Sequence, residues 1–191
     1  KGSFGIICAS LEKENPGYFK WIKDLQSSGL IEFWHHGYRE RTSADKQGEF
    51  ESGSWEEQRT IFEKGEALAM AKLGFPLAAF GPHWSGTTEA TDQALAAVPS
   101  IKIWLYGPKQ PKHFRGLSIE RIMALENPTF LPDAKKFQEL YTRNGAKAPV
   151  LVLQGHPNAW TDERWKGFVV LFEVMLQESF VTLAGLGFQL L

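Results

Sequence analysis

The stretch Ile31–Glu40, which reads IEFWHHGYRE, decides how the fold is interpreted. An apolar run typical of a buried strand ends there in two histidines, a glycine and an acid. In α/β folds the loops after the strands carry the reacting groups, because the strand fixes their position while the loop keeps them exposed. A second such run, Val150–Leu153, ends close to His156. The two stretches together predict an α/β protein whose chemistry lies at the exits of its strands.

Helical patterns alternate with these strand-like runs along the chain. Pro16 suits a first helical turn and Gly29 a helix end, while Ser54 and Glu57 have the spacing of a capping box. Continuous apolar strands that alternate with helices predict a parallel sheet covered on its faces, and the number of units suits an incomplete or irregular barrel. The expected strands cover residues 4–9, 31–34, 77–80, 101–104, 150–153 and 180–183, and the expected helices cover 16–27, 54–73, 88–98, 133–142 and 161–177.

The composition limits the classes of function. With 191 residues, 43% of them hydrophobic and 23% charged, the chain can form one domain, residues 1–191, with a substantial core. A net charge of −1 gives no electrostatic footprint for nucleic acid or for an anionic membrane. Cys8 is the only cysteine, so an internal disulfide is excluded. No segment approaches the roughly 20 apolar residues of a membrane span.

The start of the chain lacks a helix cap or a polar lead. Lys1 and Gly2 run directly into the apolar segment Phe4–Cys8. We therefore expect a preceding strand and turn upstream of this sequence, with the Phe4–Cys8 strand left without one neighbour.

His36 and Glu40 are candidate metal ligands at the exit of the first strand. Imidazole and carboxylate both suit a divalent cation such as zinc and leave positions open for water. The alternative is a hydrogen-bonded anchor for the long loop 37–53, which is itself longer than most connections within a domain. His35 departs from the face that His36 would occupy, so we expect a structural role for it.

His156 is the candidate catalytic residue. Pro157 holds it extended at a strand exit, where it can protonate a leaving amine or alkoxide near neutral pH. The alternative is a histidine that hydrogen-bonds to the following loop. His83 also follows a strand, and either lines the same cleft or is an exposed loop residue.

Tryptophans adjoin three of the candidate positions. The chain has seven, and Trp34, Trp84 and Trp160 each lie next to or near a candidate site residue in the sequence. Their flat faces can stack on sugar rings, which suits a glycan cleft, or they can fill the core. With His83, these tryptophans are the candidate substrate-binding residues.

Four motifs then resemble, in this order, the polysaccharide deacetylases of the NodB-homology type. They are Glu32–Tyr38, Ser54–Gln58, Phe80–Pro82 and Leu153–Pro157, and they extend over nearly the whole chain. The resemblance implies a distorted or incomplete (β/α)7 barrel. It further implies that a divalent metal, commonly zinc, assists hydrolysis of N- or O-acetyl groups on a carbohydrate, in a secreted or periplasmic protein.

The resemblance also assigns roles to single residues. His36 matches the first histidine of the family's His-x-x-x-His metal motif, with Glu40 in place of the second. His156 most nearly matches the histidine of the final Leu-x-His motif, which acts as general acid, although one extra residue intervenes. Of the family's Arg-x-Pro-Tyr motif, the chain keeps only Pro82. The family's Asp-Asp pair belongs to the strand before Phe4–Cys8, and no Asp precedes Asp24.

Three hypotheses about function follow. The first is a metal-dependent deacetylase that acts on a carbohydrate. The second is a catalytically inactive relative that still binds a glycan, which Glu40 and the lack of an Asp pair favour. The third is a hydrolase of other non-peptide C–N bonds on the same scaffold.

Overall fold

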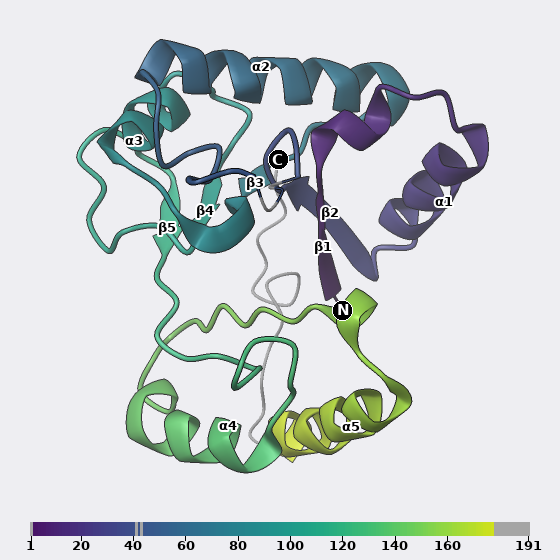
Figure 1. Cartoon of the computed structure of the whole chain (residues 1–191), viewed down its shortest axis with the longest axis vertical. Coiled ribbons are helices and arrows are strands. Elements are labelled where there is room, and N and C mark those ends of the chain that lie inside the picture. The colour runs from purple at the N-terminus through teal and green to yellow at the C-terminus, as the bar shows by residue number, and fades with distance from the viewer. Residues whose placement is uncertain (1, 41, 43, 178–191) are drawn as a thin grey trace. The chain divides into compact units, whose positions relative to one another are not determined.

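The computed structural model describes residues 2–40, 42 and 44–177 (Figure 1). Contacts divide the chain into two compact units, one that extends to Ser118 and a second that begins at Ile119. Each unit is described here by itself. The strand predicted at 180–183 lies outside the described residues.

A five-stranded sheet forms the centre of the first unit. Its strands β1 to β5 follow one another in chain order across the sheet, and β1 to β4 pair in parallel. The register runs from Gly2 opposite Ile31 to Ile6 opposite His35. Among the described residues β1 pairs with β2 alone. The bounds are β1 Gly2–Ile6, β2 Ile31–His35, β3 Ala79–Phe80, β4 Ile103–Leu105 and β5 Leu117–Ile119.

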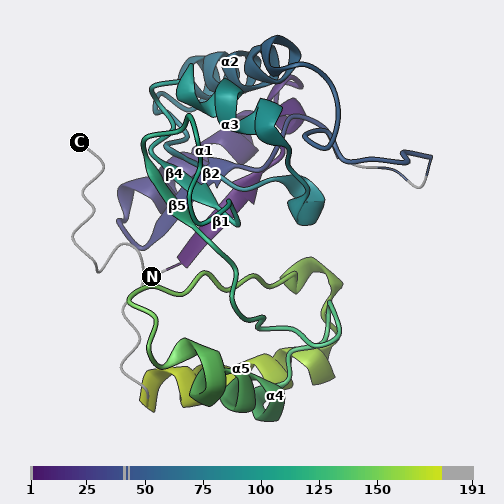
Figure 2. The same ribbon diagram turned by 90° about the vertical axis from the view of Figure 1, so that its left-hand side faces the viewer.

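Three helices connect these strands, and their starts follow local capping chemistry. Helix α1, Pro16–Ser27, begins after Asn15, whose side chain accepts a hydrogen bond from the Tyr18 amide. Helix α2, Trp55–Lys72, begins with the predicted capping box of Ser54 and Glu57. Helix α3, Glu89–Ala96, follows a box of Thr88 and Thr91 and lies beside α2 (Figure 2). The α/β alternation expected from the sequence is therefore confirmed.

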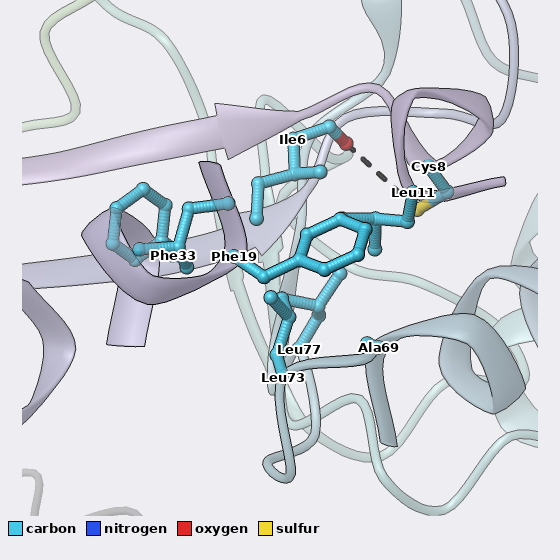
Figure 3. Close-up of a cluster of buried hydrophobic side chains, with 9 residues drawn as sticks. Ile6, Cys8, Leu11, Phe19, Phe33, Ala69, Leu73 and Leu77 are labelled. Atoms are coloured by element: carbon cyan, nitrogen blue, oxygen red, sulfur yellow. Dashed lines mark hydrogen bonds between the residues drawn. The ribbon is translucent and has the colours of Figure 1, made fainter. Parts of the chain in front are cut away.

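The first unit has two apolar clusters. One cluster joins β1 and β2 to α1 and α2 (Figure 3). Its fully buried members include Leu11 and Ile22. The second cluster joins α2 and α3 to β3 and β4, where the rings of Phe62 and Phe80 meet edge to face at 4.7 Å. These contacts fix the strand exits that carry the candidate residues.

His35 lies within this core, in agreement with its predicted structural role. Its side chain is fully buried and packs against Phe62 and Phe80. Its Nδ1 accepts a hydrogen bond from the Gly37 amide, and burial lowers its pKa to about 3. Burial also raises the pKa of the neighbouring Cys8 thiol, so that Cys8 is an unreactive core residue.

Gly65 in α2 provides the space that these two side chains occupy. A Cβ atom at this position would lie 2.4 Å from Nε2 of His35 and 2.9 Å from Sγ of Cys8. We expect Gly65→Ala to lower the free energy of unfolding by about 1–3 kcal/mol, because buried side chains cannot move aside without strain. Gly17→Ala is the matched control: a Cβ there has its nearest contact at 3.7 Å, so helix propensity should leave stability unchanged or slightly raised. Equal urea midpoints for the two variants would contradict this packing.

The second unit is built on two helices that pack side by side (Figures 1 and 2). Helix α4, Ala134–Leu140, is capped by Asp133 and continues into a π-helical turn at Tyr141–Gly145. Helix α5 spans Asp162–Gln177. The buried side chains between them are Met123, Leu125, Phe137 and Leu171.

The strand predicted at 150–153 is wrong. Residues 150–155 form neither strand nor helix. Leu151 and Leu153 instead pack against the cluster of α4 and α5. The run is apolar because it covers helices and not because it lies within a sheet.

None of the helices in the described part of the chain is long and apolar enough to cross a membrane.

Candidate functional site

His36 is fixed at the carboxyl end of β2 by contacts with both neighbouring strands. Its amide donates to the carbonyl of Ile6, and its ring Nδ1 lies 2.8 Å from the carbonyl oxygen of Gly81. A carbonyl can only accept, so Nδ1 carries a proton and donates it in this hydrogen bond. This is the arrangement in which metal-binding histidines are held by a second acceptor. His36 thus has its backbone and one ring nitrogen held at the end of β2.

The residues after β3 bring His83 and Trp84 to the same end of the sheet. The ring centroids of His83 and His36 lie 5.2 Å apart. Trp84 and Ser85 have positive φ angles of 68° and 59°, which are unfavourable for residues with side chains. Strain of this kind is typical of functional loops. It leaves Trp84 with 62% of its surface exposed.

Trp34 lies beneath His36. Its ring meets the His36 ring edge-on at 4.7 Å, and only 9% of the residue is exposed. Gly5 and Gly81 make room for this pair, since a Cβ at Gly5 would lie 2.8 Å from both rings. Trp34 therefore supports His36 from the core, whereas Trp84 is largely exposed.

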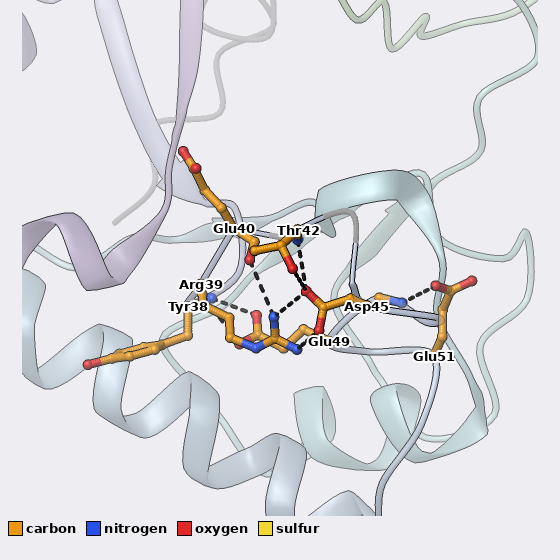
Figure 4. Close-up of polar contacts among 8 residues, drawn as sticks. Tyr38, Arg39, Glu40, Thr42, Asp45, Glu49 and Glu51 are labelled. Carbon is orange, nitrogen blue, oxygen red and sulfur yellow. Dashed lines mark hydrogen bonds and ion pairs between the residues drawn. The ribbon is translucent and has the colours of Figure 1, made fainter.

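Glu40 is exposed and does not join this group. Its carboxylate points away from the polar cluster of Arg39, Asp45 and Glu49 (Figure 4), and its carbonyl accepts from Arg39. No set of three His, Cys, Asp or Glu side chains within the described ranges is arranged to hold a metal ion. The described residues therefore fit a divalent metal only in part: His36 is oriented as a ligand, but no three-ligand set completes the site.

Charged side chains connect the described residues of the loop 37–53. Arg39 forms a bidentate pair with Asp45, which lowers the pKa of that carboxyl group. Glu49 accepts from the amides of Tyr38 and Arg39, and burial raises its pKa. Between this loop and α2 lies an open cavity of about 370 Å³, lined mainly by polar residues that include Gln47, Ser52 and Gln58.

His156, in the second unit, is bound by a buried carboxylate. Nδ1 of His156 lies 2.7 Å from Oε2 of Glu126, whose side chain is 3% exposed. The same carboxylate accepts from the amides of His156 and Phe130 and from the indole nitrogen of Trp160. Burial by itself would raise the pKa of Glu126, but these hydrogen bonds outweigh it and lower the pKa. Glu126 therefore stays ionised and holds the imidazole in one orientation.

The outer face of His156 opens to a small cavity of about 40 Å³ that includes Arg121, Thr129 and Gln154. The ring of Phe130 meets the imidazole edge-on at 5.0 Å, from a backbone position with φ of 73°. Trp160 packs against Phe168 while its nitrogen is held by Glu126, so its face belongs largely to the helical core.

The structure therefore brings His36, His83, Trp34 and Trp84 together in the first unit. It places His156 and Trp160 in the second, around Glu126. Sequence reasoning missed Glu126, Arg121 and Gln154. Glu126 follows no recognisable strand and comes 30 residues before His156, so no local pattern connects the two.

Comparison with solved structures identifies the fold. The chain is similar to a carbohydrate esterase family 4 (CE4) pseudoenzyme from Bacillus anthracis, with a TM-score of 0.58 and 13% identity over 93% of this chain and 51% of that one. It is similar to a family 4 acetyl xylan esterase from Clostridium thermocellum solved with a cobalt ion, with a TM-score of 0.55, 13% identity and coverage of 95% and 74%. A third similar structure is the CE4 domain of a xylanase from the hindgut metagenome of Trinervitermes trinervoides, with a TM-score of 0.58, 13% identity and the same coverage.

No protein-family model and no curated protein sequence matches the chain. The chain spans about half the length of the pseudoenzyme that it matches. At these identities the likeness concerns the fold, and it agrees with the family resemblance of the sequence motifs. The chain has the α/β fold of the polysaccharide deacetylase type, shared by the CE4 esterases.

Proposed function

We propose that the protein is a carbohydrate deacetylase, and that His156 transfers the proton that the leaving group needs. The observation that carries this proposal is the Glu126–His156 pair. A buried, ionised carboxylate fixes one ring nitrogen, and the His156 side chain lines a small cavity, where its other ring nitrogen lies 3.3 Å from Nε2 of Gln154. A carboxylate in this position orients an imidazole and stabilises its protonated form during proton transfer. An acyl transfer that frees a sugar amine or hydroxyl needs such a group.

The acetyl-bearing substrate is a carbohydrate in this proposal. Trp84 supports it, because its exposed indole lies next to His83 and can stack on a sugar ring. Trp34 contributes by holding His36, and Trp160 by holding Glu126. Family 4 esterases with the same fold include one that is named for acetyl xylan, which agrees with this substrate class.

The proposal includes a divalent metal, and the family resemblance favours zinc. His36 would be a ligand through Nε2, and Glu40 is the second candidate ligand. A bound metal would supply polarisation of an acetyl carbonyl. The cobalt ion in the acetyl xylan esterase supports divalent metal binding in this fold. Because Glu40 points away from its polar neighbours, we expect weak binding unless the loop moves.

A second function, glycan binding without catalysis, is favoured by a specific observation. The described residues provide no three-ligand metal group, and Glu40 stands in the place of a histidine. The CE4 pseudoenzyme with the same fold shows that this scaffold can persist without catalysis. In such a protein, Trp84 and the polar cavity beside loop 37–53 would still offer surfaces for binding a glycan.

The experiment that separates the two functions measures metal content and acetate release together. We expect the wild-type protein, supplied with zinc or cobalt, to bind metal and release acetate from an acetylated oligosaccharide. His36→Ala should lower both quantities, because it removes the oriented imidazole. His113→Ala is a control that replaces a loop histidine with 41% of its side chain exposed, and it should change neither. A wild-type protein that binds the glycan but neither binds metal nor releases acetate has the second function.

A further inference from the structure

Glu51 joins the loop 37–53 to the turn His83–Ser85, and the function proposed above assigns it no part. Its carboxylate accepts a hydrogen bond from the amide of Gly48 (Figure 4). A Cβ atom at Gly48 would lie 2.8 Å from that carboxylate and 3.6 Å from the carbonyl oxygen of His83. The loop and the turn therefore meet at this glutamate.

Gly86, the residue after the turn, provides the space that the Glu51 side chain occupies. A Cβ atom at Gly86 would lie 2.5 Å from Oε1 of Glu51 and closer still to its Cγ and Cδ atoms. Gly86 has a φ of −84° and a ψ of 129°, a conformation that any residue can adopt. The backbone therefore does not require a glycine here, whereas the packing of the glutamate does.

The turn needs contacts from outside because its backbone is strained. Trp84 and Ser85 have positive φ angles of 68° and 59°, and residues in this region persist only where their surroundings hold them. Within the turn, the amide of Ser85 donates a hydrogen bond to the carbonyl of Pro82. Glu51 adds a contact from a second segment of the chain.

We propose that Glu51 is a positioning residue that holds the strained turn and so keeps the indole of Trp84 in place for a sugar ring. The inference rests on the proposed binding of a carbohydrate by Trp84, which has 62% of its surface exposed. A turn that is fixed before the glycan arrives raises affinity, because binding then need not select a minor conformation. The loop 37–53 thereby affects substrate affinity through Trp84.

The first test is isothermal titration calorimetry of the full chain with two probes, an N-acetylated chito-oligosaccharide and an O-acetylated xylo-oligosaccharide. Glu51→Ala should bind the preferred probe about 5- to 30-fold more weakly than wild type, because the relaxed turn seldom adopts the binding conformation. Glu51→Gln keeps the side-chain length and an acceptor for the Gly48 amide, so it should retain the wild-type affinity. Glu56→Ala, at an exposed glutamate in the first turn of α2, is the matched control and should bind as wild type does.

Two double variants separate positioning from a general loss of stability. In a Trp84→Ala background, Glu51→Ala should have no further effect on affinity, because it acts through the indole. Gly86→Ala alone should weaken binding, because its methyl group collides with the glutamate. The combination of Glu51→Ala with Gly86→Ala should bind no more weakly than Glu51→Ala, because the collision is then absent.

A second readout needs no sugar. The indole NH signal of Trp84 in an NMR spectrum, assigned from its loss in Trp84→Ala, should shift or broaden in Glu51→Ala and stay unchanged in Glu56→Ala. An unchanged signal in Glu51→Ala overturns the inference, as does an equal loss of affinity with and without Trp84. A shifted signal in a protein that binds neither probe supports the role of Glu51 and refutes carbohydrate binding by Trp84, so the two failures are distinguishable.

Discussion

His156→Ala should lower the rate of acetate release by about 10²–10⁴-fold, the usual contribution of one acid–base group. A buried carboxylate fixes the orientation of this imidazole, which also lines a small cavity of the second unit. Its loss removes the proton donor for the leaving group. It should not change metal content, because the oriented metal-ligand candidate is His36.

Three measurements on one preparation test this prediction. They are acetate release, metal content and the urea midpoint of unfolding, each compared with His113→Ala. A variant that keeps wild-type turnover would show that His156 has only the loop-anchoring role. A variant that loses metal in proportion to activity would place His156 among the ligands instead.

Glu126→Ala should lower the free energy of unfolding by about 3–5 kcal/mol. The carboxylate accepts four hydrogen bonds, and two of them come from the backbone amides of Phe130 and His156. Its removal leaves these donors without their acceptor, and each unsatisfied buried donor costs about 1–3 kcal/mol. Glu139→Ala is the matched control in the same unit, because its ion pair with Lys136 is exposed and contributes little.

Urea unfolding and amide hydrogen exchange provide the measurements. Exchange at Phe130 and His156 should accelerate in Glu126→Ala and stay unchanged in Glu139→Ala. Equal unfolding free energies in the two variants would mean that Glu126 does not organise the second unit.

The same carboxylate makes stability depend on acid pH. Because folding lowers the pKa of Glu126, its contribution is complete above the ordinary value of 4.5 and is lost as the pH falls through the folded value. Glu126→Gln, which does not titrate, should lose less stability than wild type over that acid range.

Local signals in the sequence predicted the helices well. Pro16 after Asn15 and the box of Ser54 and Glu57 start α1 and α2 at the expected residues, because capping is chemistry between near neighbours in the chain. The prediction of a strand at 150–153 was wrong because it depends on what the segment packs against, and no near neighbour in the chain indicates this. An apolar run does not reveal whether its partner is a strand or a helix.

The candidate site was predictable only where a residue type carries its own chemistry. Histidines that follow strands can be recognised in the sequence as candidate site residues, and the structure places His36 and His83 beside each other. Their partners were hidden, since the carbonyl of Gly81 lies 45 residues from His36 and any residue could supply it. Glu126, Arg121 and Gln154 acquire their meaning from contacts over long sequence separations.

Mass spectrometry of a defined acetylated oligosaccharide, incubated with zinc and either wild-type protein or His156→Ala, tests the central claim most directly. We predict that wild-type protein removes acetyl groups and that His156→Ala leaves the oligosaccharide acetylated over the same time. An oligosaccharide that binds the wild-type protein yet keeps every acetyl group would contradict the proposed deacetylase activity. It would instead support the second function, glycan binding without catalysis.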